Sequence, residues 1–246
     1  MKTTEFGFER VSEQDKTRRV AQVFSSVANR YDLMNDLMSW GLHRLWKRFA
    51  VAMAGIRAGD RVLDLAGGTG DLAALITKRV GAEGCVVLAD INADMLRLGR
   101  DRLLNQGMVN GLAYVQADAE ALPFEDNAFD VLTLAFGLRN VTEKNRALAS
   151  MCRVLRPGGV AIILEFSHVV LPLLRTLYDR YSFAVLPRLG ASVAGDGDSY
   201  RYLVESIRTF PEQAELAQMM AAAGFGDVRW NNLSAGIVAV HRGYKL

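Results

Sequence analysis

The sequence predicts a doubly wound α/β domain built on a mostly parallel β-sheet, and three observations carry this prediction. First, residues 61–71 (RVLDLAGGTGD) pass from a short apolar run through clustered glycines into helical periodicity, which is typical of strand, tight turn and helix. Second, apolar runs and amphipathic helical patterns alternate from there to about residue 165. Third, half of the 246 residues are hydrophobic, which is enough to build a full core.

The glycine-rich turn marks the place where a ligand is expected. Ligands of doubly wound sheets bind beyond the carboxyl ends of the strands, and Gly67, Gly68, Thr69 and Gly70 directly follow the first strand. Glycine allows a close approach of the backbone to a ligand and adopts positive φ without strain. The free N–H groups of the next helix favour an anionic group on the ligand.

The remaining elements of this domain follow from the same patterns. We expect Thr142 to cap the third helix, and the turn 156–159 (RPGG) to end it and lead into the next strand. A last helix should end at Gly224. The predicted strands are Val62–Ala66, Cys85–Ala89, Leu112–Gln116, Val131–Phe136, Val160–Glu165, Val228–Asn232 and Gly236–His241, and the predicted helices include Leu72–Val80, Met95–Leu104 and Lys144–Leu155.

The N-terminal region, residues 1–56, is predicted to form a helical cap on the domain of residues 57–246. Residues 1–16 are polar and are expected to be loosely held, and helices should follow from Thr17 onward. The helix Leu42–Ala54 mixes apolar and basic residues. Its composition predicts packing on the sheet with a solvated basic face, and the alternative is an interfacial helix that meets lipid.

A long insert, about residues 166–211, precedes the last helix and strands. It is rich in aromatic residues, and Pro172 and Pro187 divide it into short pieces. Such an insert beside the carboxyl edge of a sheet is often a lid or a wall of the substrate site, although helices that merely cover the sheet would show the same pattern. Residues 195–200 (GDGDSY) lack the later ligands of a calcium loop and indicate a turn before a helix.

Composition excludes several classes of protein. The net charge is +2 and there is no long basic stripe, which argues against a nucleic-acid partner. Cys85 and Cys152 lie in apolar patterns and predict no disulfide, and His43 and His168 lack metal-ligand spacing, so no metal is assigned. No apolar run has the length of a membrane span and no signal peptide is evident, so we expect a cytoplasmic protein.

Acidic residues at the ends of successive strands predict a nucleoside ligand. Asp64 lies within the first strand, just before the turn, and Asp90 ends the second strand, where a carboxylate can accept both ribose hydroxyls. Asp118 follows the third strand, where a carboxylate can accept an adenine amino group while the N–H of Ala119 meets a ring nitrogen. Alternatively, Asp90 and Asp118 are ordinary caps of a helix or turn.

The glycine pattern favours S-adenosyl-L-methionine over a dinucleotide. A nicotinamide site usually has three spaced glycines, and Ala73 stands where the third is expected. S-adenosylmethionine needs backbone donors for its carboxylate and acceptors for ribose and adenine, which this set supplies. Residues 60–165 resemble the class I S-adenosylmethionine-dependent methyltransferases, whose fold is Rossmann-like.

Further stretches narrow the resemblance to one family. Residues 31–46 (YDLMNDLMSWGLHRLW) and 153–167 (RVLRPGGVAIILEFS) resemble the two signatures of the ubiquinone/menaquinone biosynthesis C-methyltransferase family. Residues 136–142 (FGLRNVT), 199–206 (SYRYLVES) and 241–245 (HRGYK) are also similar to that family. The resemblance runs from about Val20 to the last residue.

This resemblance implies methyl transfer to a ring carbon of a polyprenylated quinol, with menaquinol or ubiquinol intermediates as products. It also implies that Thr69, Asp90, Asp118 and Ala119 contact the cofactor. The family often has Ser where this chain has Ala135, so that cofactor contact is lost or replaced. The family also commonly has Ser-Lys-Pro where residues 167–169 are Ser-His-Val, which puts the local loop in question.

Carbon methylation of a quinol needs a group that stabilises a phenolate and a group that accepts a proton. Arg139 and Asn140 follow the fourth strand, and we expect Arg139 to stabilise the phenolate and Asn140 to orient a hydroxyl or a water. The alternative for Arg139 is a salt bridge with Glu143, four residues on. Tyr31 is predicted to cover the sulfonium or carry the proton, and its alternative is a core tyrosine.

Three other functions stay open from the sequence alone. They are a different small-molecule methyltransferase, a nicotinamide oxidoreductase, and a nucleoside-binding protein without activity. Because a polyprenylated quinol resides in a membrane, we also expect peripheral contact with the inner face of a membrane. The sequence decides neither the oligomeric state, for which a homodimer is an option, nor the quinone.

Overall fold

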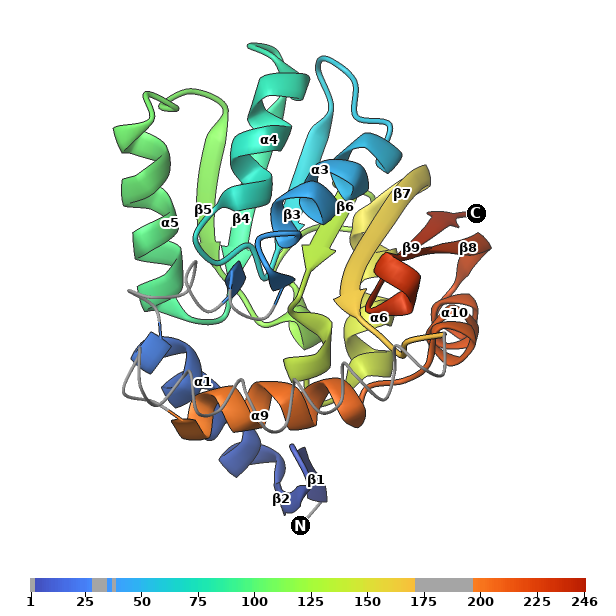
Figure 1. Cartoon of the computed structure of the whole chain (residues 1–246). Helices are drawn as coiled ribbons and strands as arrows, with labels where there is room; N and C mark the ends of the chain where they lie inside the picture. The colour runs from blue at the N-terminus through green and yellow to red at the C-terminus, as the bar shows by residue number, and fades with distance from the viewer. Residues whose placement is uncertain (1–2, 28–34, 37–38, 171–196) are drawn as a thin grey trace.

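Seven strands form the central sheet of the protein, with helices on both of its faces (Figure 1). The structure is a computed structural model and describes residues 3–27, 35–36, 39–170 and 197–246. The strand order is β5-β4-β3-β6-β7-β9-β8. The strands are β3 Arg61–Leu65, β4 Cys85–Asp90, β5 Leu112–Gln116, β6 Phe129–Ala135, β7 Leu155–Phe166, β8 Phe225–Leu233 and β9 Val238–Lys245.

The first five of these strands are parallel, and β9 runs antiparallel to both of its neighbours. The chain builds outward from β3 to β5 and then returns to start β6 beside β3. The direction of winding therefore reverses between β3 and β6, which is the position where doubly wound sheets bind ligands. The predicted doubly wound, mostly parallel architecture is confirmed.

Each face of the sheet carries its own apolar core, because side chains on a strand alternate between faces. Val62 and Leu88 belong to the core under one set of helices, whereas Leu63 and Leu65 belong to the core under the other. The first set is α3 His43–Met53, α4 Asp71–Val80 and α5 Ala93–Asn105, and the second is α6 Lys144–Val154 and α10 Gln213–Ala222.

Most predicted elements are found with small shifts of their ends, and two details were predicted wrongly. Residues 156–159, predicted as a turn, already belong to β7, and one helix cap was misplaced. Helix α6 follows Glu143, which makes no side-chain capping bond, so Thr142 does not cap it. Thr142 instead lines a cavity described below. Gly224 stands just beyond α10 with φ +104°, where an L side chain would be strained, as expected for a glycine that ends a helix.

The N-terminal residues are not loosely held, which corrects the prediction for residues 1–16. Strands β1 Thr3–Phe6 and β2 Glu9–Ser12 form a hairpin. Gly7 begins its two-residue turn with φ +60°, a conformation that glycine adopts without strain. Phe6 stacks on Tyr202 with ring centroids 4.1 Å apart. This aromatic contact stabilises the hairpin against the domain.

Two helices cross beyond the carboxyl ends of the strands, as Figure 1 shows below the sheet: α1 Glu13–Val27 and α9 Gly197–Arg208. Helix α1 begins earlier than predicted, and Ser12 Oγ accepts a hydrogen bond from the Asp15 N–H at its start. Helix α9 is the described end of the predicted insert. Residues 171–196 of the insert, and Tyr31, lie outside the described residues.

Helix α3 packs on the sheet, as the first interpretation of residues 42–54 predicts. Its buried side includes Trp46, Ala50 and Val51. Its outer side is not purely basic, however, since Leu45 and Phe49 are exposed there. Within the described residues, no helix combines the length and hydropathy needed to cross a membrane.

A cofactor cavity at the switch point of the sheet

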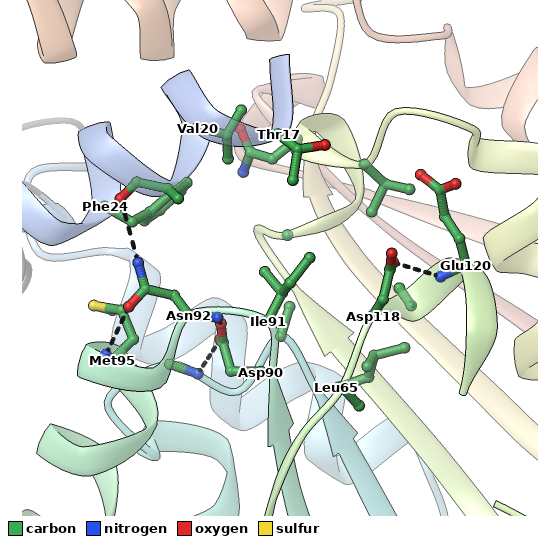
Figure 2. Close-up of a pocket in the computed structure, with 18 of the residues that line it drawn as sticks. Thr17, Val20, Phe24, Leu65, Asp90, Ile91, Asn92, Met95, Asp118 and Glu120 are labelled. Atoms are coloured by element: carbon green, nitrogen blue, oxygen red, sulfur yellow. Dashed lines mark hydrogen bonds between the residues drawn. The ribbon is translucent and has the colours of Figure 1, made fainter. Parts of the chain in front are cut away.

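A cavity opens at the carboxyl ends of the strands, where the winding of the sheet reverses (Figure 2). It has an empty volume of about 940 Å³, with its open mouth included. Its floor is formed by the turns that follow β3, β4, β5 and β6, and its roof by α1. The lining includes Ala66, Gly68, Asp90, Asn92, Asp118, Ala119, Phe136, Gly137, Asn140, Val141 and, from α1, Thr17, Val20, Ala21 and Phe24.

The glycine turn after β3 is shaped by close backbone packing. A Cβ on Gly67 would overlap Leu88 Cδ1, and one on Gly99 of α5 would overlap the carbonyl oxygen of Gly68. Ala66 and Gly68 have φ of 52° and 53°, so the chain turns sharply there. The turn after β6 touches this one, since a Cβ on Gly137 would overlap that of Ala66. Because these glycines have no side chains, both turns and α5 can pack closely around the cavity.

Asp90 links the ends of two strands. Its Oδ2 accepts from the N–H of Gly68, and its Oδ1 accepts from the N–H of Asn92, both at 2.9 Å. Burial raises the pKa of this carboxyl, while the backbone N–H groups oppose that rise. Each carboxylate oxygen has a further lone pair, so Asp90 can still accept from two vicinal hydroxyls. The capping alternative for Asp90 was wrong, because Asn92 is the residue that caps α5. Asp90 nevertheless combines two structural hydrogen bonds with a place in the cavity wall.

Asp118 and Ala119 stand together at the exit of β5. The side chain of Asp118 accepts from the N–H of Glu120 at 2.9 Å and begins the short 3₁₀ helix Ala119–Ala121. Both Asp118 and Ala119 line the cavity. Figure 2 shows Asp118 on the side away from α5. The turn interpretation is therefore correct and does not exclude a ligand contact, since one carboxylate oxygen stays available.

The other predicted cofactor residues do not line the cavity. Asp64 is fully buried beneath the glycine turn and accepts from Thr133 Oγ1 at 2.8 Å. Burial raises the pKa of Asp64 to about 7. Thr69 is buried beside Arg102, whose Nη1 lies 3.5 Å from its hydroxyl. Gly70 has φ +80° and begins α4, so these residues and Gly67 support the turn from behind.

Helix α1 and Asn92 are parts of this site that the sequence interpretation missed. Asn92 caps α5 through Oδ1, and its Nδ2 donates to Ala21 O of α1 at 3.3 Å. Figure 2 shows Phe24 and Val20 of α1 above Asp90 and Ile91. The sequence does contain an apolar helix face at Val20 and Phe24. That pattern predicts a helix, but it does not indicate that the helix contacts a ligand.

Asn140 and Arg139 are adjacent in sequence but face different cavities. Asn140 lines the cofactor cavity, and its Oδ1 accepts from the Tyr202 hydroxyl at 3.0 Å. Arg139 lines a second cavity on the other side of this loop. Its Nη1 is 2.6 Å from Glu165 Oε1, and both side chains are buried. The predicted salt-bridge partner Glu143 was therefore wrong, because β7 places Glu165 directly beside the loop.

The residues of the cavity fit S-adenosylmethionine. Two carboxylates, at Asp90 and Asp118, end neighbouring strands and can accept from ribose and from an adenine amino group. The glycine turn leaves room for the backbone to approach a ligand, and Gly68 lines the cavity. Apolar side chains of Ile91, Met95 and Phe24 surround these acceptors, as a purine ring requires.

Solved structures with the same architecture define the class of fold. A protein described as a possible histamine N-methyltransferase from Thermotoga maritima superposes with a TM-score of 0.65 at 20% identity, over 92% of this chain and 99% of its own. A SAM-dependent methyltransferase from Aquifex aeolicus gives a TM-score of 0.63 at 17% identity, over 87% and 97%. The fold is that of the class I methyltransferases, as predicted.

The chain belongs to the ubiE/COQ5 methyltransferase family, whose model matches residues 11–245. The ubiquinone/menaquinone biosynthesis C-methyltransferase UbiE of Edwardsiella ictaluri is 61% identical over 99% of this chain and 97% of its own length. The protein of the same name from Francisella tularensis, strain SCHU S4, is 57% identical over 99% and 98%. The family that the motifs suggested is confirmed.

Proposed function

We propose that this protein transfers a methyl group from S-adenosylmethionine to a ring carbon of a polyprenylated quinol, in the biosynthesis of menaquinone, ubiquinone or both. The observation that carries the proposal is its 61% identity, over nearly the full length of both chains, to a C-methyltransferase of these pathways. The acids at the ends of β4 and β5 support it independently, because they suit the nucleoside part of the methyl donor.

S-adenosylmethionine supplies, when bound, a methyl group that its sulfonium charge has already activated. In this proposal Asp90 accepts the ribose hydroxyls, and Asp118 with the N–H of Ala119 recognises adenine. The start of α4, at Gly70, lies behind the glycine turn and does not line the cavity, so its N–H groups are not assigned to the donor's carboxylate. Asp64, Gly67, Thr69 and Gly70 act behind this surface, by fixing the turn. The enzyme's remaining task is to make the acceptor carbon nucleophilic and to aim it.

Asn140 is the described residue best placed to meet the acceptor hydroxyl. Its side-chain oxygen accepts from the Tyr202 hydroxyl, and in this proposal its amide N–H groups donate to a quinol oxygen. Donors aimed at a developing phenolate stabilise it and so increase electron density on the neighbouring ring carbon. Tyr31, which lies outside the described residues, keeps its proposed part as a lid or proton carrier.

Arg139 acts through the loop rather than on the substrate, which changes the role first proposed for it. Its guanidinium is held by Glu165 Oε1 and by Phe136 O, at 2.6 and 2.7 Å. The N–H of Arg139 also donates to Glu165 Oε2. A cation bonded in this way has little freedom to meet a phenolate, but it fixes the backbone that presents Asn140. We therefore propose Arg139 as a positioning residue.

The test of the function is a methyl-transfer assay on the purified protein. A labelled methyl donor and a short-tailed demethylated naphthoquinol or benzoquinol should yield product with the label on a ring carbon. Label on an oxygen, or no transfer to either quinol, would favour a different small-molecule methyltransferase. Calorimetry with S-adenosylhomocysteine and with NAD distinguishes either kind of methyltransferase from an oxidoreductase. A methyltransferase should bind S-adenosylhomocysteine and not NAD.

A peripheral contact with a membrane completes the proposal, because the substrate's prenyl tail is lipid-soluble. Trp40 and Leu45 are 77% and 57% exposed, and Leu42 and Phe49 lie on the same outer side of α3. Basic side chains stand beside them, at Arg44 and Arg48. An apolar strip flanked by cations is suited to the interface of an anionic bilayer.

This contact is testable with vesicles. The double variant Leu45→Asp, Phe49→Asp should lose sedimentation with phosphatidylglycerol vesicles, whereas Leu104→Asp, which changes an exposed leucine of α5, should not. Equal sedimentation of both variants, or recovery of the unchanged protein entirely in the supernatant, would contradict it.

A further inference from the structure

A second, polar cavity lies on the other side of the loop that carries Asn140. It has an empty volume of about 750 Å³, with its open mouth included, and is bordered by the β1–β2 hairpin, α1, α9 and the start of α6. None of the residues proposed above to bind the methyl donor lines this polar cavity. Its charged lining residues are Glu5, Arg10, Lys16, Arg139 and Lys144, and its hydroxyl groups come from Thr3, Thr4, Tyr202, Ser206 and Thr209.

Two lysine ammonium groups converge in this cavity on one carbonyl oxygen. Lys16 Nζ, from α1, lies 3.3 Å from Val141 O, and Lys144 Nζ, from α6, lies 3.2 Å from the same atom. Lys16 is only 3% exposed. Each ammonium has three donors, and within the described residues Val141 O is the one acceptor that either has.

The other charges of the cavity do not compensate these lysines by contact. Glu5 and Arg10 face each other across the hairpin at its exposed rim. Arg139 is paired with Glu165. Several carboxylates act on the lysines through space, with Glu5 first: Glu5, Glu120 and Glu143 act on both lysines, and Glu165 also acts on Lys144. In the described chain, however, no carboxylate lies within 4.0 Å of either ammonium.

Buried cations of this kind normally have a counter-charge. Burying an ammonium without a partner is unfavourable, and two like charges that share one acceptor add repulsion. Accordingly, burial and the neighbouring Lys144 lower the pKa of Lys16 to about 8, and burial lowers the pKa of Lys144. In addition, Arg139 Nε is buried without a hydrogen-bond partner among the described residues. The cavity thus combines unused hydrogen-bond donors with two ammonium groups that no carboxylate contacts in the described chain.

We propose that this polar cavity binds a small dissolved oxoanion of the phosphate type, held between Lys16 and Lys144. Such an anion supplies several acceptor oxygens and the negative charge that both ammonium groups lack. Thr3 and Thr4 make no side-chain hydrogen bond elsewhere in the described chain, so their hydroxyls are free to donate. The anion would join the hairpin, α1 and α6 at one point. This site is independent of the proposed methyl transfer.

The test is binding of inorganic phosphate at constant ionic strength, with chloride as the reference anion. Phosphate should raise the melting temperature of the protein, and calorimetry should give a measurable Kd. Lys16→Met and Lys144→Met keep most of the side-chain packing and should each raise that Kd about tenfold or more, the effect of losing a charge-assisted hydrogen bond. Lys78→Met, an exposed lysine on α4, should leave it unchanged.

Further readouts keep the test decisive if a variant folds poorly. Without phosphate, either variant should melt at or above the temperature of the unchanged protein, because an uncompensated buried charge has been removed. In the unchanged protein, phosphate should raise the pKa of Lys16, measured by NMR of the lysine side chains. No phosphate binding, or a Kd and lysine pKa values that do not respond, would overturn the proposal. So would lysine-dependent binding to phosphatidylglycerol vesicles without binding of free phosphate.

Discussion

The cofactor cavity and the polar cavity share one loop, residues 137–142, yet they are built in opposite ways. In the cofactor cavity, each acid is bonded to backbone close by in sequence or in the sheet, as Asp90 is to the N–H groups of Gly68 and Asn92. In the polar cavity, Lys16 and Lys144 come from distant parts of the chain and share one carbonyl.

This difference separates two kinds of binding site. The cofactor cavity is preorganised: its acceptors are fixed before a ligand arrives, which reduces the entropy lost on binding. The polar cavity is fixed by packing, but in the described chain no carboxylate contacts its two lysine ammonium groups, so an entering anion would be the first to do so. Changes on the cofactor side should therefore reduce affinity for the methyl donor, whereas changes of Lys16 or Lys144 should alter the response to anions and leave that affinity unchanged.

The largest effect is expected for Asp90→Asn. The variant loses the carboxylate that accepts both ribose hydroxyls, and each charge-assisted bond contributes about 1.5–3 kcal/mol. We expect calorimetry with S-adenosylhomocysteine to show Kd raised about 100-fold. Phosphate binding in the polar cavity should be unchanged. The control Asp94→Asn, on the exposed first turn of α5, should keep the affinity for S-adenosylhomocysteine, and equal weakening by the two variants would contradict the assignment.

Asn140→Ala changes the wall between the two cavities. Turnover of a quinol acceptor should fall about 10- to 100-fold, because a donor to the developing phenolate is lost. The affinity for S-adenosylhomocysteine should stay within about twofold, since this side chain contacts the quinol and not the methyl donor. Tyr202→Phe, which removes the hydroxyl that orients Asn140, should give a smaller loss of turnover. A variant with unchanged kcat would exclude Asn140 from the reaction.

Gly99→Ala tests the packing that holds the glycine turn. Alanine in mid-helix normally stabilises a helix by about 1 kcal/mol relative to glycine. Here the added Cβ would overlap the carbonyl oxygen of Gly68, and overpacking of this kind costs about 1–3 kcal/mol. Thermal unfolding should therefore show a lower melting temperature and weaker donor binding. Arg100→Ala, on the exposed side of the same helix, should change stability little, and a stabilised Gly99→Ala would show that α5 can move away.

The smallest effect is a pH dependence beneath the turn. The pKa of Asp64 is raised from 3.8 to about 7 in the folded protein, so the folded state binds the proton more tightly than the unfolded state. The contribution of this group to stability is complete below pH 3.8 and is lost as the pH rises toward 7. Asp64→Asn should therefore be more favourable, relative to the unchanged protein, at pH 8 than at pH 5. Denaturant unfolding at the two values measures this, and an equal difference at both would show that Asp64 titrates normally.

The sequence predicted those parts of the molecule that depend on near neighbours. The strands, the glycine turn and the positions of Asp90 and Asp118 follow from periodicity and from the rule that parallel strands end at one edge. The resemblance to family motifs then indicated a polyprenylated quinol as the methyl acceptor. The hairpin Thr3–Ser12 was missed because its short polar strands resemble a flexible tail, although the sequence Gly7-Phe8 suits a two-residue turn.

The contacts that no local pattern contains could not be predicted. The sequence marks Glu165 only as the last residue of a predicted strand, whereas the folded sheet places it beside Arg139. That ion pair holds the guanidinium away from the cofactor cavity. Likewise, Lys16 and Lys144 are 128 positions apart in the printed sequence and meet only because α1 crosses the carboxyl edge. Tertiary packing determines such pairs, so sequence spacing carries no signal for them.

The central claim is that the carboxyl ends of β3, β4 and β5 bind the adenosyl part of the methyl donor. A crystal structure of the protein with S-adenosylhomocysteine tests it most directly. The account predicts the ribose hydroxyls on Asp90, and adenine between Asp118 and Ala119 under α1. The same ligand found in the polar cavity, or with its ribose away from Asp90, would contradict the account.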